Sequence, residues 1–226
     1  MTMTKEERVE AERIRLAGMF EDQDEIADRA QTVFGVDEAG RGPLCGPVVA
    51  GCCILDKGRE ILWLNDSKKI SEKKRELIYE DVVNNSLAYG IGTASPERID
   101  EINILNATYE AMRDAYENCR RMYAERGYNA DDADTVVLVD SNKTVPGILC
   151  RQTAVVKGDA KCPSISAASI LAKVTRDRMM IEYDKEHPEY GIAKHKGYGT
   201  KEHIEAIRKY GVTDIYRMSF LKNILK

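Results

Sequence analysis

The sequence lacks a long apolar run. No stretch of its 226 residues approaches the roughly 20 consecutive apolar residues of a membrane-spanning helix. Residues 1–18 read MTMTKEERVEAERIRLAG and contain no apolar core of the kind found in secretion signals. No repeat and no low-complexity linker interrupts the chain. We therefore expect a cytoplasmic protein with no membrane partner, built as one domain with appended helices.

Soft metal ligands are also scarce. The chain has three histidines, and their spacing matches no zinc site. Its six cysteines form no Cys-x-x-Cys pair, so we expect free thiols rather than a zinc or dithiol redox site. Cys52 and Cys53 are adjacent, and on a strand their side chains would point to opposite faces.

The formal net charge of −4 argues at first against a nucleic-acid partner, because phosphate binding usually needs positive charge. Residues 1–30 carry nine acidic and five basic side chains, so this segment accounts for the whole of that charge. Residues 140–226 carry 16 basic and 10 acidic side chains. We predict a charged, solvated helical arm over 1–30 and a domain over 31–226 that becomes basic toward its end.

Hydrophobic patterning predicts an α/β domain with a mixed sheet, because strands come first as a set and then alternate with helices. Between residues 105 and 123, large apolar and aromatic side chains recur every three or four residues, which indicates a helix with Leu105 in the core. Ser95-Pro96 is typical of a helix start, and Ser71 is a plausible N-cap. Strands are predicted at 32–36, 47–55, 87–94, 135–139 and 153–156, and helices at 5–29, 71–83, 105–123, 163–180 and 201–209.

Acidic side chains follow the ends of predicted strands. Asp37-Glu38 and Asp140 each end a strand, and Asp159 lies just beyond another. In an open α/β sheet such positions meet at one edge, where converging carboxylates repel each other unless a cation is present. Oxygen ligands favour Mg²⁺ or Mn²⁺. A single acid of this kind can also cap a helix, and Asp177, between arginines inside a helix, is better explained by ion pairing.

Two glycine-containing turns could approach a ligand. Gly40-Arg41-Gly42 offers backbone donors close to any bound group, although turns of this kind are common. His195–Thr200 sets Tyr198 among basic residues and glycines, as a residue that stacks on a sugar or base would be placed. By itself, this second segment is equally consistent with a tyrosine in a helix-entry turn.

Taken together, these segments resemble the bacterial ribonuclease HII family. The matching stretches follow the family's order and cover roughly residues 31 to 210, and the Gly-Arg-Gly triplet separates them from the related type HIII enzymes. The resemblance implies an RNase H-like mixed five-stranded sheet flanked by helices, with extra C-terminal helices. The stretches are VDEAGRGPLCGPVVA at 36–50, DSKK at 66–69, KGD at 157–159, SISAASILAKVTRDR at 164–178 and HKGYGT at 195–200.

The resemblance also implies a metal-dependent endonuclease. Such an enzyme hydrolyses the RNA strand of RNA/DNA hybrids and cuts 5′ of single ribonucleotides in duplex DNA, leaving 3′-hydroxyl and 5′-phosphate ends, as in ribonucleotide excision repair and primer removal. The resemblance also selects Asp159 over Asp177 as the fourth acid. The four acids expected to hold two Mg²⁺ or Mn²⁺ ions are Asp37, Glu38, Asp140 and Asp159.

Substrate contacts follow from the same resemblance. Gly40-Arg41-Gly42 would read the ribose 2′-hydroxyl through its backbone, and Tyr198 would stack on the next deoxyribose. The tail departs from the family's His-Arg-x-Ser-Phe pattern, reading Tyr216-Arg217-Met218-Ser219-Phe220. Candidate phosphate contacts are Arg41, Lys68, Lys69, Lys157, Lys196 and Arg217.

Two other functions stay open at this point. Another RNase H-like nuclease or strand-transferase could use the same carboxylates on plain DNA. A catalytically silent nucleic-acid-binding module is the second alternative, although it has no need for all four acids. We expect a monomer in each case.

Overall fold

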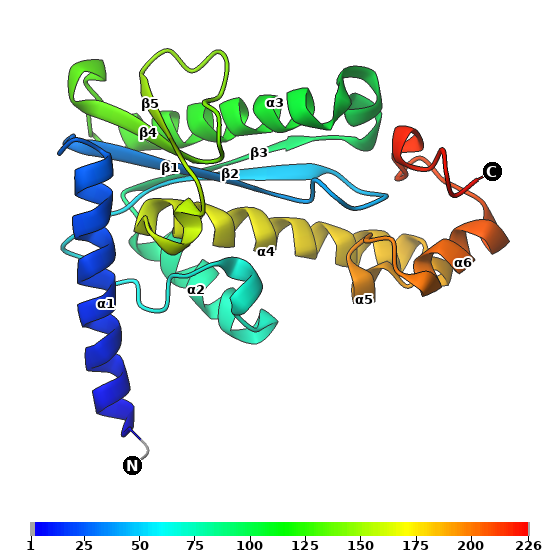
Figure 1. Ribbon diagram of the computed structural model, residues 1–226, viewed down its shortest axis with the longest axis horizontal. Coiled ribbons are helices and arrows are strands. Elements are labelled where there is room, and N and C mark those ends of the chain that lie inside the picture. The colour runs from blue at the N-terminus through cyan, green and yellow to red at the C-terminus, as the bar shows by residue number, and fades with distance from the viewer. Residues whose placement is uncertain (1–2, 226) are drawn as a thin grey trace.

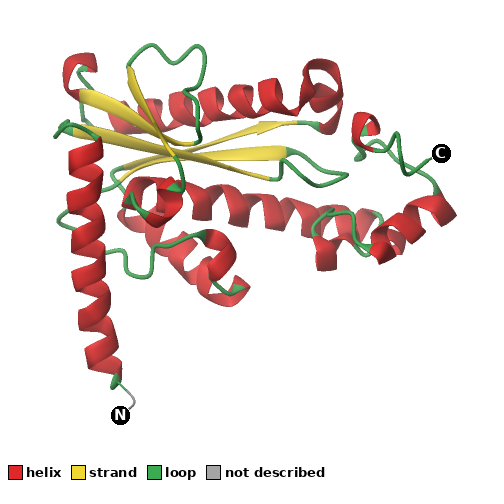
Figure 2. Cartoon of the chain, in the orientation of Figure 1, coloured by secondary structure: helices red, strands yellow, loops and turns green. Residues whose placement is uncertain are grey.

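The computed structural model describes residues 3–225 and shows a mixed sheet between two layers of helices (Figure 1, Figure 2). The predicted fold class is confirmed. β1 lies at the centre, antiparallel to β2 and parallel to β4, in the order β3-β2-β1-β4-β5. The strands are β1 Thr32–Ala39, β2 Val48–Ile54, β3 Ala88–Ala94, β4 Thr135–Asp140 and β5 Arg151–Val155.

Helix α3 covers one face of the sheet, and α4 with α2 covers the other (Figure 1). Within residues 3–225, no helix combines the length and the apolar character needed to cross a membrane. The α-helices are α1 Lys5–Ile26, α2 Glu72–Asn85, α3 Pro96–Glu125, α4 Pro163–Glu186, α5 Ile192–His195 and α6 Lys201–Tyr210. Single 3₁₀ turns lie at Ser67–Lys69, Asp132–Asp134, Gly158–Ala160, Pro188–Tyr190 and Met218–Phe220.

The three central strands, β1, β2 and β4, are buried on both faces over nearly their whole length, which explains why they read as continuous apolar runs, whereas the edge strand β5 is partly exposed. Every residue of β2 is buried. Cys52 packs into the core beneath α3 and Cys53 into the core beneath α2 and α4, as their adjacent positions on a strand predict. All six cysteines are free thiols.

Helix α4 lies unusually close to the sheet because small residues meet on both sides. A Cβ added at Gly35 of β1 would lie 2.1 Å from the backbone of Ser164, and one added at Gly51 would lie 2.4 Å from the carbonyl oxygen of Ala168. The Ala- and Ser-rich sequence of α4 therefore allows this close packing, which places the helix against the end of β1 that carries Asp37.

Helix α3 begins as predicted, with Ser95 accepting a hydrogen bond from the amide of Arg98. The prediction that Leu105 belongs to the core is wrong, since this side chain is 40% exposed. Asn103 adopts φ 67° and ψ 163° and interrupts the helix, and its side chain accepts from the amides of Leu105 and Asn106. The helix therefore buries Ile99 before this kink and resumes its buried stripe at Ala107 after it, with Leu105 turned outward between them.

Helix α1 is one continuous helix whose second half is part of the core rather than a solvated arm. Leu16 packs in the cluster beneath α2 and α4, and the buried Gln23 accepts hydrogen bonds from both the backbone N–H and the hydroxyl of Ser164, at 3.0 and 2.7 Å. Buried Glu12 accepts from the amide of Trp63. The division at residue 30 stays a prediction, and residues 1, 2 and 226 lie outside the described residues.

A small second core joins the C-terminal elements to the connection between β1 and β2. Leu44 and Cys45 of that connection pack with Met180 at the end of α4 and with Tyr216 of the tail. An isolated bridge pairs Cys45 with Tyr216. The tail is thereby held beside residues 40–47, although some 170 residues of chain separate them.

Candidate active site

Three elements bring the predicted acids to one edge of the sheet. The parallel pairing of β1 with β4 ends at Val36 opposite Val139, so Asp37 and Asp140 are the next residues of the two adjacent strands. Side chains alternate between the two faces of a strand, and this alternation turns both Asp37 and Asp140 toward the face covered by α4. The loop after β5 adds Asp159, and its Gly158 amide donates to Asp140 Oδ1 at 2.9 Å. We call Asp37, Glu38, Asp140 and Asp159 the carboxylate edge.

The carboxylate edge is electrostatically strained. Burial, followed by the charges of Glu38 and Asp140, raises the pKa of Asp37 well above its usual value. Burial and then Asp140 raise the pKa of Asp159 to about 6. Burial also raises the pKa values of Glu38 and Asp140. Each anionic carboxylate is therefore disfavoured by its surroundings, and added positive charge would relieve this.

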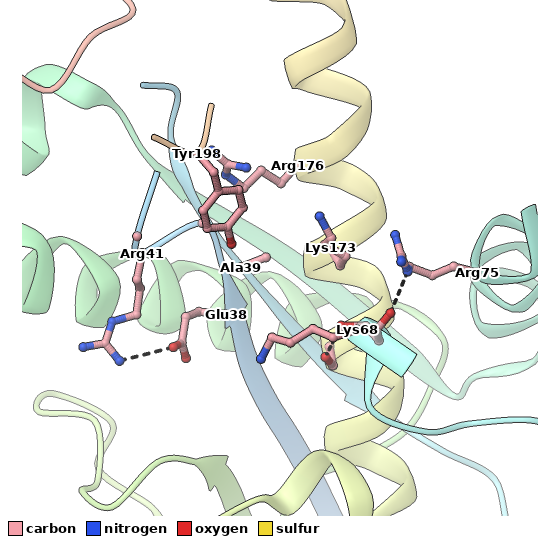
Figure 3. Close-up of a pocket in the computed structure, with 12 residues that line it drawn as sticks. Glu38, Ala39, Arg41, Lys68, Arg75, Lys173, Arg176 and Tyr198 are labelled. Atoms are coloured by element: carbon pink, nitrogen blue, oxygen red, sulfur yellow. Dashed lines mark hydrogen bonds and ion pairs between the residues drawn. The ribbon is translucent and has the colours of Figure 1, made fainter. Parts of the chain in front are cut away.

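Lys68 supplies part of that charge. The 3₁₀ turn Ser67–Lys69 places its ammonium where Asp37, Asp66 and Asp159 all raise its pKa against the opposing effect of burial. Figure 3 shows Lys68 pointing toward Glu38. Asp66 belongs to the stretch 66–69 that the sequence analysis quotes but was given no role there, yet it raises the pKa of Asp159. Its place directly before Ser67-Lys68-Lys69 is the signal that marks it.

A pocket of about 420 Å³ opens beside Glu38 (Figure 3). One wall is the glycine turn, our name for residues 40–47, represented there by Gly40, Arg41 and Gly42. Tyr198 is 47% exposed and lines the pocket. A Cβ added at Gly42 would lie 3.6 Å from the Tyr198 ring, so turn and ring form one surface.

The pocket is also lined by basic side chains that the sequence analysis did not propose. Arg75, Lys173 and Arg176 line it together with Lys68. Asp177 lies behind them, pairing with Arg75 at 3.2 Å and with Lys173 at 2.6 Å, which confirms its structural role. The i, i+4 spacing of Lys173 and Asp177 on α4 was the signal available in the sequence.

Three of the predicted phosphate contacts, Lys69, Lys157 and Lys196, lie outside the lining of the pocket. Lys69 pairs loosely with Asp66 at 3.9 Å, and Lys157 is an exposed residue with φ 57° at the start of a 3₁₀ turn. Lys196 donates to the Ala193 carbonyl at 2.7 Å and pairs with Glu72 of α2 at 3.6 Å, so its ammonium is already engaged.

Arg217 was predicted to contact phosphate, and the structure contradicts this. The residue is 0% exposed and its guanidinium donates to backbone carbonyls of the glycine turn. Arg217 directly follows Tyr216, whose bridge with Cys45 joins the tail to the glycine turn, and this pairing places Arg217 against the turn.

The carboxylate edge has the chemistry of a hard divalent-cation site. Its only donors are carboxylate oxygens. The pKa values of Asp37 and Asp159 are raised by burial and by the neighbouring carboxylates, and a bound cation would offset both effects. Within residues 3–225, no three acidic, histidine or cysteine side chains already form a compact coordination set. The donor set therefore fits Mg²⁺ or Mn²⁺ in chemistry, with Lys68 standing among the acids.

Comparisons with known proteins agree with this geometry. The sequence model of the family described as Ribonuclease HII matches residues 34–223. A Ribonuclease HII of Clostridioides difficile strain 630 is 52% identical over 219 residues, which cover 96% of this chain and 80% of that protein. A Ribonuclease HII of Francisella tularensis subsp. novicida strain U112 is 50% identical over 188 residues, covering 83% of this chain and 95% of that protein.

Solved structures share the fold. The ribonuclease H2 of Pyrococcus horikoshii OT3 matches with a TM-score of 0.67 at 28% identity, covering 86% of this chain and 97% of that one. Bst-RNase HIII in complex with Mn²⁺ matches with a TM-score of 0.67 at 13% identity, covering 88% and 70% of the two chains. With its acids on adjacent strand ends and its Gly-Arg-Gly turn against Tyr198, the chain belongs to the ribonuclease HII family of ribonuclease H endonucleases.

Proposed function

We propose that the carboxylate edge and the pocket beside it form a catalytic centre that cuts nucleic acid 5′ of a ribonucleotide. Its substrates would be the RNA strand of RNA/DNA hybrids and single ribonucleotides embedded in duplex DNA. Its products would carry 3′-hydroxyl and 5′-phosphate ends. The observation that carries this proposal is the juxtaposition of four mutually repelling carboxylates with a basic pocket walled by a glycine turn and an exposed tyrosine.

Asp37 and Asp140 would be the central ligands of two divalent cations, Mg²⁺ or Mn²⁺, and Glu38 and Asp159 would complete the pair of sites. When bound, such cations activate a water nucleophile and stabilise the leaving oxygen of an in-line displacement. The Gly158 amide holds Asp140 in orientation through its 2.9 Å hydrogen bond. Arg41 restrains Glu38 through a 3.3 Å ion pair.

The pocket would position the substrate. Lys68 and Arg41 are placed to contact phosphate, and Lys173 and Arg75 add positive charge behind them. The ring of Tyr198, half exposed beside Gly42, offers a flat surface on which a sugar can pack. Backbone N–H groups of the glycine turn would bind the 2′-hydroxyl without regard to base identity, which is how a protein tells RNA from DNA at one position.

The decisive experiment compares three end-labelled duplexes: all-DNA, DNA with one ribonucleotide, and an RNA/DNA hybrid. Each is incubated with the protein in Mg²⁺ and in EDTA. We expect cleavage of the second and third in Mg²⁺ only, with the cut 5′ of the ribonucleotide. Equal cleavage of all-DNA duplex would favour another RNase H-like nuclease, and binding without any product, even in Mn²⁺, would favour the silent binding module.

A further inference from the structure

Two buried arginines, Arg176 and Arg217, are the largest fully buried side chains of the protein. Among the described residues 3–225, the hydrogen bonds of both guanidiniums all go to backbone carbonyls and none goes to a carboxylate. Burial lowers the pKa of both, and for Arg217 burial and the neighbouring charge of Arg176 lower it to about 9. An unpaired buried charge is costly unless it is fully hydrogen-bonded, so these residues need a structural reason.

Both guanidiniums bind the backbone of the glycine turn. Arg217 donates to the carbonyls of Gly40, Arg41, Pro43 and Gly46 at 2.7, 3.1, 2.9 and 2.9 Å. Arg176 donates to Cys45 and Pro47 at 3.1 and 3.0 Å, and the Arg217 amide donates to Leu44 at 3.0 Å. Six of the eight carbonyls in residues 40–47 therefore accept hydrogen bonds from these two side chains, and a seventh, that of Leu44, accepts from the backbone amide of Arg217.

This arrangement decides where the amides point. In a trans peptide the N–H of one residue is opposite the C=O of the residue before it. By holding the carbonyls of Gly40 and Arg41, Arg217 directs the N–H groups of Arg41 and Gly42 the other way. In the part of the chain that is described, those two N–H groups have no acceptor. The turn thus presents two free donors beside the pocket.

We propose that Arg217 is the positioning residue that aims the Arg41 and Gly42 amides at the 2′-oxygen and adjacent phosphate of the substrate. The proposal rests on the function proposed above. A guanidinium on the two carbonyls also polarises the peptide groups and strengthens their N–H donors. Arg176 serves a different part of the same turn, because it holds Cys45, Pro47 and the Lys196 carbonyl rather than Gly40 and Arg41.

The tail fixes Arg217 independently of the turn. Asp100, near the start of α3, accepts hydrogen bonds from the amides of Met218 and Ser219 at 2.7 and 2.9 Å. The guanidinium carbon of Arg217 also lies 5.3 Å from the centre of the Phe220 ring. Arg217 is therefore anchored from α3 on one side and bound to the glycine turn on the other.

The test measures a ratio that the fraction of folded protein does not affect. Dissociation constants are determined by fluorescence anisotropy in EDTA for an all-DNA duplex and for the same duplex with one ribonucleotide. Arg217→Lys keeps the charge but loses the planar fork of donors. We expect the ratio of the dissociation constant for the all-DNA duplex to that for the ribonucleotide-containing duplex to fall about tenfold, as for the loss of hydrogen bonds to a charged or polar ligand. Arg208→Lys, an exposed change on α6, serves as the matched control and keeps the wild-type ratio.

Asp100→Asn supplies a second variant that leaves Arg217 itself in place. It weakens the anchor of the tail, and we expect a smaller fall of the ratio in the same direction. A wild-type ratio in both variants, or no discrimination by the wild-type protein in EDTA, would overturn the role of Arg217. Failure of the proposed function has a different signature, because the wild-type protein would then cleave no ribonucleotide-containing duplex in Mg²⁺.

Discussion

The carboxylate edge and the glycine turn are neighbours in space but are stabilised in opposite ways. The four acids of the edge repel one another, and their surroundings disfavour their charges. The carbonyls of the turn are instead held almost completely by Arg176 and Arg217. The edge is thus prepared for ions from outside the protein, whereas the turn is held rigid from within. Substitutions should separate these two kinds of stabilisation.

The largest effect on cleavage is expected from substitutions at the carboxylate edge. Asp37→Asn and Asp140→Asn each remove a charge that would balance a cation, so we expect cleavage to fall by at least about 10²-fold. Thermal stability should be unchanged or higher, because the substitution relieves repulsion that raises the pKa of Asp37. Cleavage rates and melting temperatures test this. A wild-type rate in both variants would refute the metal assignment.

The glycine turn should respond differently, losing stability and activity together. Gly40 has φ +92°, and an added Cβ would lie 2.0 Å from Arg176 Nε. We expect Gly40→Ala to cost about 1–3 kcal/mol of folding free energy, measured by urea unfolding. Gly42→Ala is the control, since its Cβ would make only a 3.6 Å contact with Tyr198. Equal stability losses in the two variants would argue against a rigid, arginine-held turn.

Substitutions of Tyr198 test the surface that the glycine turn and this ring would present to the substrate. Its half-exposed ring contributes little to the core, so Tyr198→Ala should leave the melting temperature nearly unchanged. We expect roughly tenfold weaker cleavage of a duplex with a single ribonucleotide, as for the loss of one stacking contact. Tyr198→Phe retains the ring and should retain the activity. An unaltered rate for the alanine variant would remove Tyr198 from substrate recognition.

The smallest effect on cleavage is expected at His203, which lies behind the segment 195–200 and supports it. The buried His203 ring contacts the Tyr198 carbonyl at 2.9 Å and the Tyr216 hydroxyl at 3.0 Å, and it stacks on His195. Burial lowers the pKa of His203 to about 4. Its contribution to stability is therefore complete above about pH 6.5 and falls as the pH drops toward 4, by roughly 1.4 kcal/mol per unit, because the unfolded chain is protonated first.

Urea unfolding of wild type and His203→Gln between pH 7 and pH 4.5 checks this. Glutamine does not titrate, so the stability difference between the two proteins should shrink as the pH falls. Cleavage at pH 7 should change little beyond the loss of folded protein. Parallel stability curves for the two proteins would show that His203 does not carry the effect.

Local patterns in the sequence were enough to predict the strands, the long helices and the meeting of acidic side chains at one edge of the sheet. Apolar runs that end in carboxylates are local patterns, and neighbouring parallel strands bring such ends together. The same local reasoning failed at Leu105, where a single left-handed residue, Asn103, shifts the face of the helix. It also missed the packing of α1, because Leu16 is buried by residues of other elements and Gln23 by Ser164, which is 141 positions away.

The contacts of the buried arginines could not be predicted from local patterns, because they depend on the folded chain. In the sequence, Arg217 is one basic residue of a basic C-terminal part, and phosphate contact is the ordinary expectation for it. Its actual partners, the carbonyls of residues 40–46, are about 170 positions away. Charge and spacing are local properties, but whether a guanidinium binds phosphate or backbone depends on what the folded chain places around it, and here the pairing of the tail with the glycine turn settles that.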